Sequence, residues 1–222
     1  MLSSRDRLLE AAARVYAEQG FRGATTRRIA DEAGVNEITV FRHFGSKEAL
    51  IHEALRVRAT APKPVELPAE PRDPERELTA WATAEIADMR SCRALIRRTM
   101  TEMGERPEIV GCQSAGPLEA KQKLCDYVSR LRAHGFVTAI GGSAQQCEWD
   151  EAAVAMLMGA LFSDAMGRDV MPDMFPVSAE RAPEMYVRIF LRAVGVGHAQ
   201  SAPARSVRAT ARAAKHTTRK VK

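Results

Sequence analysis

Apolar residues recur at helical spacing near the start of the chain. One face of a helix is formed, at the i, i+4, i+7 and i+8 positions, by Leu8, Ala12, Val15 and Tyr16. Ser3 or Ser4 is expected to cap this helix, because a serine side chain accepts backbone N–H groups at a helix start. Gly20 is expected to end it, and Phe21 to fold back onto the core.

Two shorter helices are predicted between residues 25 and 44, separated by a glycine turn. Thr25 is expected to cap the first of them, whose small apolar face holds Ile29, Ala30 and Ala33. Gly34 then ends this helix, since glycine adopts a left-handed backbone at least cost. Asn36 is expected to cap the second helix, which stops at Gly45, and Ser46 to cap the next. Two short helices joined by a tight turn form the unit whose second helix fits a DNA major groove.

Residues 5 to 50 resemble the N-terminal domain of the TetR family of one-component transcriptional regulators. The matching positions are Leu8, Ala12, Gly20, Phe21, Thr25, Ile29, Ala30, Ala33, Gly34, Val35, Thr39, Phe44, Lys47 and Leu50. The resemblance implies an all-α fold: an N-terminal three-helix DNA-binding domain with the helix-turn-helix, and a larger C-terminal helical domain for ligand binding and dimerisation. It further implies a homodimer that binds double-stranded DNA and that releases this DNA when a small-molecule effector binds.

Four positions depart from the family pattern. The family usually has tyrosine where Phe41 stands, so one phosphate-touching hydroxyl is missing. It often has lysine and glycine where Glu37 and Ile38 stand. Glu37 either accepts from a cytosine amine or favours the helix N-terminus electrostatically, and Ile38 either meets a thymine methyl or packs inside. Arg28 replaces the usual capping glutamate, which suits a phosphate neighbour.

Basic side chains surround the predicted reading helix. Arg27 or Arg28 is expected to contact a phosphate. The family resemblance implies that Lys47 contacts a phosphate as well. Arg42 is expected to fork onto a guanine, and His43 to contact phosphate or base. The alternative is that these are solvated surface charges. The predicted DNA-binding residues are Thr25, Arg27, Arg28, Asn36, Glu37, Ile38, Thr39, Phe41, Arg42, His43 and Lys47.

The remaining pattern predicts a connector and four longer helices. Residues 60–74 hold five prolines and read as an extended connector. Loops and a short helix are expected across the glycine-containing segment 104–116. The longer helices are expected at about residues 74–103, 117–134, 146–167 and 179–196.

Glu85 interrupts the apolar face of the helix predicted from residue 74. Its carboxylate lies either at the wet edge of that face or in a cavity where it meets a polar or cationic ligand. Methionines and aromatic residues at helical spacing are either plain core or the lining of an effector pocket. The candidate pocket residues are Trp81, Glu85, Met89, Met100, Met103, Trp149 and Phe162.

The segment 154–162 is apolar on nearly every side, so its helix is expected to be buried on every side. Together with the helix at 179–196, it is the candidate dimer interface, where small residues permit close approach. The residues concerned are Ala155, Gly159, Ala160, Ile189 and Phe190. The resemblance implies a four-helix bundle formed by these last two helices of each copy. The alternative is the central core helix of a monomer.

Composition narrows the class of protein. With 222 residues, 45% of them hydrophobic, the chain can bury a sizeable core. No apolar run is long enough for a membrane span, and the N-terminus lacks a signal-peptide layout, so a cytoplasmic protein is expected. Cys92, Cys112, Cys125 and Cys147 lack zinc-site spacing and are expected to be reduced thiols; a redox sensor is the minor alternative. No cofactor or metal is expected.

The net charge of +5 belongs to the C-terminal segment. Residues 198–222 contain seven basic residues and no acid: Arg205, Arg208, Arg212, Lys215, Arg219, Lys220 and Lys222. Removing these seven charges from +5 leaves −2 for residues 1–197. The basic positions would form one stripe on a helix, so we expect a tail that is disordered alone and becomes helical on DNA phosphates. A merely solvated tail is the alternative.

The sequence therefore predicts a dimeric, ligand-responsive repressor of a palindromic operator. The expected units are a DNA-binding domain at 1–50, a ligand-binding and dimerisation domain at 51–197 with the connector at 60–74, and the tail at 198–222. One alternative is an architectural or non-specific DNA-binding protein that uses the tail. An enzyme is not expected, because no Ser-His-Asp, metal or phosphate-loop pattern is present.

Overall fold

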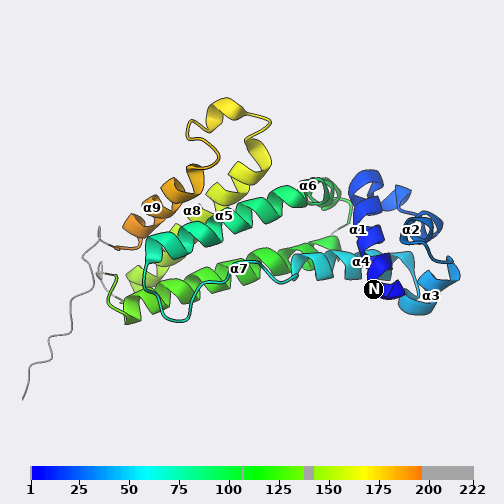
Figure 1. The fold of residues 1–222 in the computed structure, drawn as a ribbon, viewed down its shortest axis with the longest axis horizontal. Coiled ribbons are helices and arrows are strands. Elements are labelled where there is room, and N and C mark those ends of the chain that lie inside the picture. Colours follow the sequence, from blue (N-terminus) through cyan, green and yellow to red (C-terminus); the bar gives the residue numbers. More distant parts are fainter. Residues whose placement is uncertain (1, 107, 138–142, 197–222) are drawn as a thin grey trace, which may run out of the picture.

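The computed structural model describes residues 2–106, 108–137 and 143–196, with the side chains of 108–113, 143 and 144 left undescribed. Within these ranges the protein is helical, apart from one antiparallel bridge between Val137 and Val196. The expected all-α fold is confirmed (Figure 1). The helices are α1 (Ser4–Gly23), α2 (Thr26–Ala33), α3 (Ile38–Phe44), α4 (Lys47–Ala59), α5 (Pro74–Ser91), α6 (Arg93–Glu102), α7 (Glu108–Ala133), α8 (Ser143–Gly167), the 3-10 helix η1 (Pro172–Met174) and α9 (Ala182–Ala193).

The predicted start of α1 and both predicted ends of α2 are confirmed, but α1 does not end at Gly20, because it continues to Gly23. Ser3 caps α1 and exchanges hydrogen bonds with Asp6 in a capping box. Thr25 accepts from the N–H of Arg28 at 3.2 Å and so caps α2, which Gly34 ends with φ 63°. Local side-chain chemistry therefore fixes both ends of α2 before any long-range packing is considered.

Gly20 breaks the backbone of α1 with φ 68° and ψ 180°, although one more turn follows as far as Gly23. Phe21 is buried directly after this break and joins the core of the N-terminal helices, as predicted. A residue with a side chain would be strained at this φ. The break thus turns the end of α1 towards α6, the helix that packs on it.

The single helix expected over residues 74–103 is divided into α5 and α6 at Cys92, which has φ −111° and ψ 21°. The division follows from packing. Trp81 of α5 belongs to the core formed with α7, α8 and α9, whereas Leu95 of α6 belongs to the core of α1–α4. The apolar periodicity runs through the junction, but its two halves serve different cores.

The prediction that the next helix begins at Pro117 was wrong, because α7 begins at Glu108 and carries Pro117 inside it. Proline removes one backbone donor from a helix, so packing has to hold the two halves of α7 together. The neighbouring Gly116 shows how close that packing is. A Cβ at Gly116 would lie 2.6 Å from the carbonyl oxygen of Ala59, at the end of α4.

Two cores organise the described chain. The first joins α1–α4 with Leu95 of α6, and the second joins α5, α7, α8 and α9. Figure 1 shows α1–α4 gathered at one end of an elongated molecule, with α5 and α7 running along its length. The helix α4 packs on α1 in the first core and on α7 beyond it. We call α5, α7, α8 and α9 the larger bundle. A structural change in the larger bundle can therefore reach the N-terminal helices through α4 and α6.

A buried carboxylate ties three helices of the second core. Asp164 of α8, whose side chain is 1% exposed, accepts from Arg90 of α5 at 2.8 Å and from the Tyr186 hydroxyl of α9 at 2.9 Å. It also pairs with Arg168, which continues to the carbonyl of Val177 at 2.6 Å. Burial alone disfavours the charged form, but these hydrogen bonds outweigh it and lower the pKa of Asp164.

Candidate DNA-binding surface

The helix α3 buries only one of its seven residues, Val40. Ile38 is 73% exposed and Phe41 is 51% exposed, and the two lie about one helical turn apart on the outer face. Arg42 and His43 are exposed beside them. Thr39 is half-buried. The inward-packing alternative for Ile38 is therefore wrong. Apolar side chains that are this exposed on a short helix present methyl and ring edges to whatever binds the helix.

The turn before α3 is fixed by Asn36 and Glu37. The Asn36 side chain accepts from the N–H of Ile38 at 2.9 Å, although Glu37, and not Asn36 as predicted, occupies the N-cap position of α3. The Glu37 side chain makes no capping bond to α3. Instead it accepts from the hydroxyl of Thr26 at 2.5 Å, which places its charge at the start of α2. The helix dipole favours that position, so the electrostatic role of Glu37 falls on α2 rather than on its own helix.

The first turn of α2 carries no acidic residue to offset its cations. Arg27 and Arg28 are both exposed, and among the described residues no ion pair engages either of them. Thr25 is exposed as well, with its hydroxyl committed to the cap. The start of α2 therefore presents two guanidinium groups, each with a planar set of donors that matches phosphate oxygens.

Lys47 is held by the backbone of Phe21. Its ammonium donates to the Phe21 carbonyl at 2.9 Å and lies 4.1 Å from the centre of the Phe21 ring. An ammonium has three N–H donors, so two remain after this bond. The half-buried Lys47 is thus a positioned cation rather than a free surface charge. The position of its partner, far back in the sequence at the end of α1, could not be derived from spacing alone.

The seven candidate pocket residues do not meet at one site. Trp81 and Glu85 are buried in the second core, and Met89 packs against it. Met103 is half-buried at the end of α6. The other three, Met100, Trp149 and Phe162, are exposed. Exposure of these three arises because α6 leaves the second core after Cys92, and because one face of α8 is uncovered.

Glu85 lies in a buried polar cluster rather than at a wet edge. Its carboxylate is 3.6 Å from the ammonium of Lys63, in the proline-rich connector, and burial raises the pKa of Glu85. Lys63 also pairs with Asp88, which accepts from Arg58 of α4 at 2.7 Å. Sequence reasoning missed Lys63 because the connector has no periodicity that could align it with α5.

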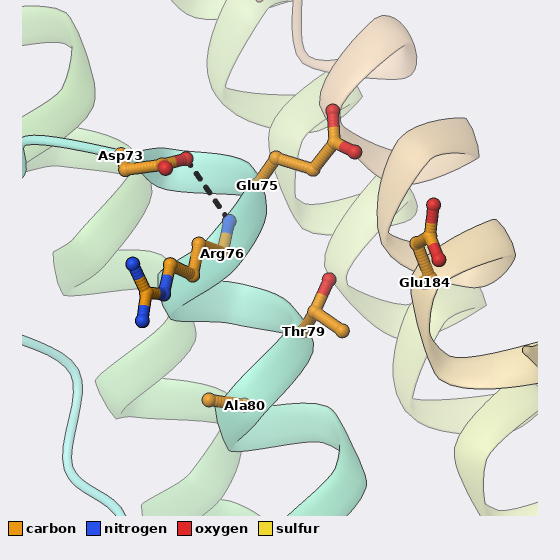
Figure 2. Close-up of a pocket in the computed structure, with 6 residues that line it drawn as sticks. All are labelled: Asp73, Glu75, Arg76, Thr79, Ala80 and Glu184. Carbon is orange, nitrogen blue, oxygen red and sulfur yellow. Dashed lines mark hydrogen bonds between the residues drawn. The ribbon is translucent and has the colours of Figure 1, made fainter. Parts of the chain in front are cut away.

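A shallow depression lies between the start of α5 and α9 (Figure 2). It is lined by Asp73, Glu75, Arg76, Thr79, Ala80 and Glu184. Figure 2 shows Asp73 capping α5 through the N–H of Arg76, at 3.1 Å. None of the candidate pocket residues lines this polar surface hollow.

One face of α8 is uncovered by the rest of the described chain. Met156 is 71% exposed, and Ala155 and Gly159 are exposed on the same helix. Ile189 of α9 is 56% exposed. The expectation that this helix is buried on every side is therefore not met within one chain. Of the other two candidate interface residues, Ala160 is half-buried, whereas Phe190 packs inside the second core.

Other chemistry is sparse in the part of the chain that the structure describes. There, no three His, Cys, Asp or Glu side chains converge as metal ligands. No helix among those residues is long and apolar enough to cross a membrane. Cys92, Cys125 and Cys147 are free thiols, and burial raises the pKa of Cys92 and Cys125. Cys112 and the basic segment 198–222 lie outside what is described at side-chain level.

Comparison with known proteins supports the assignment of the N-terminal helices. Residues 8–54 match the family described as bacterial regulatory proteins, tetR family. The chain is 26% identical over 148 residues to the uncharacterised HTH-type transcriptional regulator YvkB of Bacillus subtilis, covering 67% of this chain and 77% of that protein. It is 48% identical over 54 residues to the transcriptional repressor KstR2 of Mycobacterium tuberculosis. That second match spans 24% of this chain and only 27% of the repressor.

Solved structures share the fold over most of the chain. Salmonella enterica GusR superposes with a TM-score of 0.63 at 20% identity, covering 86% of this chain and 95% of that one. A transcriptional regulator from Rhodococcus superposes with a TM-score of 0.62 at 20% identity, covering 88% of this chain and all of that one. At this level of identity the likeness extends to the arrangement of helices and not to the residues of any site.

Proposed function

Because the chain belongs to the TetR family of transcriptional regulators and is a DNA-binding regulator, we propose that it acts as a dimeric repressor of a palindromic operator. The observation that carries the proposal is the outer face of α3. Its Ile38, Phe41 and Arg42 are exposed in the described chain. A helix of this kind, held by α2 across a glycine turn, enters the major groove with its exposed side chains against base edges.

Base contacts are proposed for four residues of α3 and the turn before it. Arg42 donates two hydrogen bonds to a guanine, and Ile38 and Phe41 meet thymine methyl groups. Glu37 keeps one oxygen on Thr26 and has the other available for a cytosine amine. The operator is therefore expected to combine a guanine with neighbouring thymines in each half-site.

Phosphate contacts are proposed around this reading surface. Lys47, Arg27 and Arg28 supply charge, with His43 at the end of α3. Such contacts fix the register of the protein on DNA without reading sequence. Thr25, Asn36 and Thr39 complete the proposed DNA-facing set. The side-chain oxygens of Thr25 and Asn36 already accept backbone N–H groups, from Arg28 and Ile38 respectively.

A second copy of the chain is the proposed cover for the exposed face of α8 and α9. Met156, Trp149, Phe162 and Ile189 are apolar and exposed there. A soluble protein rarely leaves several large apolar side chains uncovered on one face, so an interface accounts for them. Pairing through this face gives the two reading helices the two-fold symmetry that a palindrome matches.

We propose that a small-molecule effector binds within the second core, near the buried Glu85 and Trp81. In this proposal residues 1–50 bind DNA, and 51–197, with the connector at 60–74, bind the effector and the second copy. Effector binding counts as allosteric only if it changes operator affinity and the operator changes effector affinity by the same factor.

Selection of bound sequences from random DNA tests the proposal. The expected product is an inverted repeat whose half-sites lie about one or more helical turns apart. Selection without any sequence preference would contradict it and would favour the architectural alternative, in which segment 198–222 binds DNA by charge alone. A single unrepeated motif would contradict the dimer while leaving sequence-specific binding intact.

A further inference from the structure

The peptide of Phe21 lies between the larger bundle and the cation proposed to contact a phosphate. On one side, Glu102 at the end of α6 accepts from the Phe21 N–H at 3.1 Å. On the other side, the Phe21 carbonyl accepts from the ammonium of Lys47 at 2.9 Å. A single residue thus links a carboxylate of α6 to the first residue of α4 through its own backbone donor and acceptor.

The local structure is built around that carboxylate. A Cβ at Gly20 would lie 2.5 Å from Glu102 Oε1, so the left-handed glycine makes the room that the carboxylate occupies. The second oxygen of Glu102 accepts from the buried hydroxyl of Tyr16 at 2.9 Å. Burial and this carboxylate raise the pKa of Tyr16. Glu102 is therefore held at two points on α1, at the backbone and at a side chain.

The Phe21 ring reinforces the link. Lys47 lies 4.1 Å from the ring centre and the guanidinium of Arg106 lies 3.4 Å from it, while the ring itself is buried. Cations over an aromatic face are attracted by its electron density. The ring and the carbonyl together give the ammonium of Lys47 one favoured position.

We propose that Glu102 is a positioning residue that sets the phosphate contact of Lys47 from α6. The inference rests on the proposed DNA-binding function, and it adds the residue through which the larger bundle acts on that contact. Movement of α6 displaces Glu102, which displaces the Phe21 peptide and with it the acceptor of Lys47. Glu102 itself touches no DNA in this scheme.

The sign of the effect separates this role from simple electrostatics. Removing an acidic group from a DNA-binding protein ordinarily strengthens its attraction to phosphates. Glu102→Ala is instead expected to weaken operator binding about tenfold, because Lys47 loses its fixed position. Each phosphate contact contributes about 0.9 to the slope of log affinity against log salt concentration, so the magnitude of that slope should fall by up to about 0.9.

The experiment measures operator affinity by fluorescence anisotropy over a series of salt concentrations, with the selected operator as the probe. Lys47→Gln supplies the reference decrease in slope. The Glu102→Ala/Lys47→Gln double variant is expected to match Lys47→Gln alone, because both changes remove the same phosphate interaction. Glu102→Gln should retain most of the slope, since its amide oxygen still accepts from the Phe21 N–H. Glu105→Ala is the matched control, because it removes the same charge from an exposed position three residues away, and it should not lower the magnitude of the slope.

A wild-type slope in Glu102→Ala, or affinity decreases that multiply in the double variant, would overturn the proposal. Circular dichroism checks that each variant is folded. If Glu102→Ala does not fold, Glu102→Asp serves instead, because it keeps the charge but draws the carboxylate back by one methylene, and the same decrease in slope is expected. Failure of the wild-type protein to select any DNA sequence would count against the proposed function and is distinguishable from these outcomes.

Discussion

Asp164 shows how one residue can hold helices that are distant in sequence. Its carboxylate is buried and joins α5, α8 and α9 through Arg90, Arg168 and Tyr186. Replacing one member of a buried ion pair leaves the other charge without compensation. The residue is therefore expected to matter for stability although it lies outside the candidate DNA-binding surface.

Asp164→Asn should reduce the free energy of unfolding by about 3 kcal/mol at neutral pH, because two arginines lose their buried counter-charge. Urea denaturation followed by circular dichroism measures the change. Glu184→Gln is the control, since Glu184 pairs with Arg188 in an exposed position and its removal should cost less than about 1 kcal/mol. Equal decreases in the two variants would contradict the role given to Asp164.

Acid should remove the contribution of Asp164. Burial opposes its ionisation, but the bonds from Arg168 and Tyr186 prevail and hold its pKa below the ordinary 3.8. A depressed folded-state pKa gives stability that is complete above the ordinary pKa and is lost as the pH falls through the folded-state value. The difference in unfolding free energy between wild type and Asp164→Asn should therefore shrink below about pH 4. A difference independent of pH would argue against ionic stabilisation.

Gly20 is the second residue whose replacement is expected to lower the stability of the fold. Gly20→Ala places a side chain at φ 68° and a Cβ 2.5 Å from Glu102, so it should destabilise the fold by about 1–3 kcal/mol. Thermal unfolding compares it with Gly104→Ala, whose added Cβ meets nothing within 4 Å. The Gly104 variant should leave the melting temperature nearly unchanged. If both variants behave alike, the close approach of Glu102 is not what requires glycine at position 20.

At the scale of single elements, the uncovered face of α8 and α9 carries the clearest prediction. Ile189→Asp puts a charge on the proposed interface and should convert the dimer to monomer while leaving each chain helical. Sedimentation velocity measures the mass. Met100→Asp is the matched control, because Met100 is similarly exposed but lies on α6. A wild-type protein that sediments as a monomer would remove the explanation for this face.

Element boundaries divide into those with local causes and those without. Thr25, Gly34 and Ser46 could be predicted because a cap or a left-handed glycine acts within a few residues. The division at Cys92 could not, since it reflects the competition of two cores for one continuous apolar stripe. The same limit applies to the candidate site. The helix α3 itself could be predicted from spacing, but the exposure of Ile38 stayed open, and the partners Phe21 and Glu102 depend on how α1 and α6 meet.

At the scale of the whole molecule, charge is unevenly distributed along the sequence. Residues 1–197 carry −2 once the seven basic residues of segment 198–222 are taken from the total of +5. A DNA-binding body with slight negative charge is expected to depend on locally placed cations, and Arg27, Arg28 and Lys47 are the ones proposed here. Non-specific attraction to DNA is then expected to come from the C-terminal segment.

Deleting residues 203–222 should reduce the salt slope of DNA binding by about 0.9 for each phosphate that the segment neutralises, while the preferred sequence stays the same. Anisotropy titrations at several salt concentrations measure both quantities with the selected operator and a scrambled duplex. Replacement of the seven basic residues by glutamine is the control for length, and it should reproduce the deletion. An unchanged slope would show that the segment does not contact phosphates.

The burial pattern of α3 has a consequence for how such proteins diverge. Because the buried Val40 and the partly buried Phe44 anchor the helix to the core, its outward positions can be exchanged at little risk to folding. In the proposed function, a duplicated gene can therefore acquire a new operator through a few substitutions on one short helix and keep the rest of its sequence. The same property is useful for engineering. A library of variants at positions 37, 38, 41 and 42 would test new DNA targets while the rest of the sequence stays unchanged.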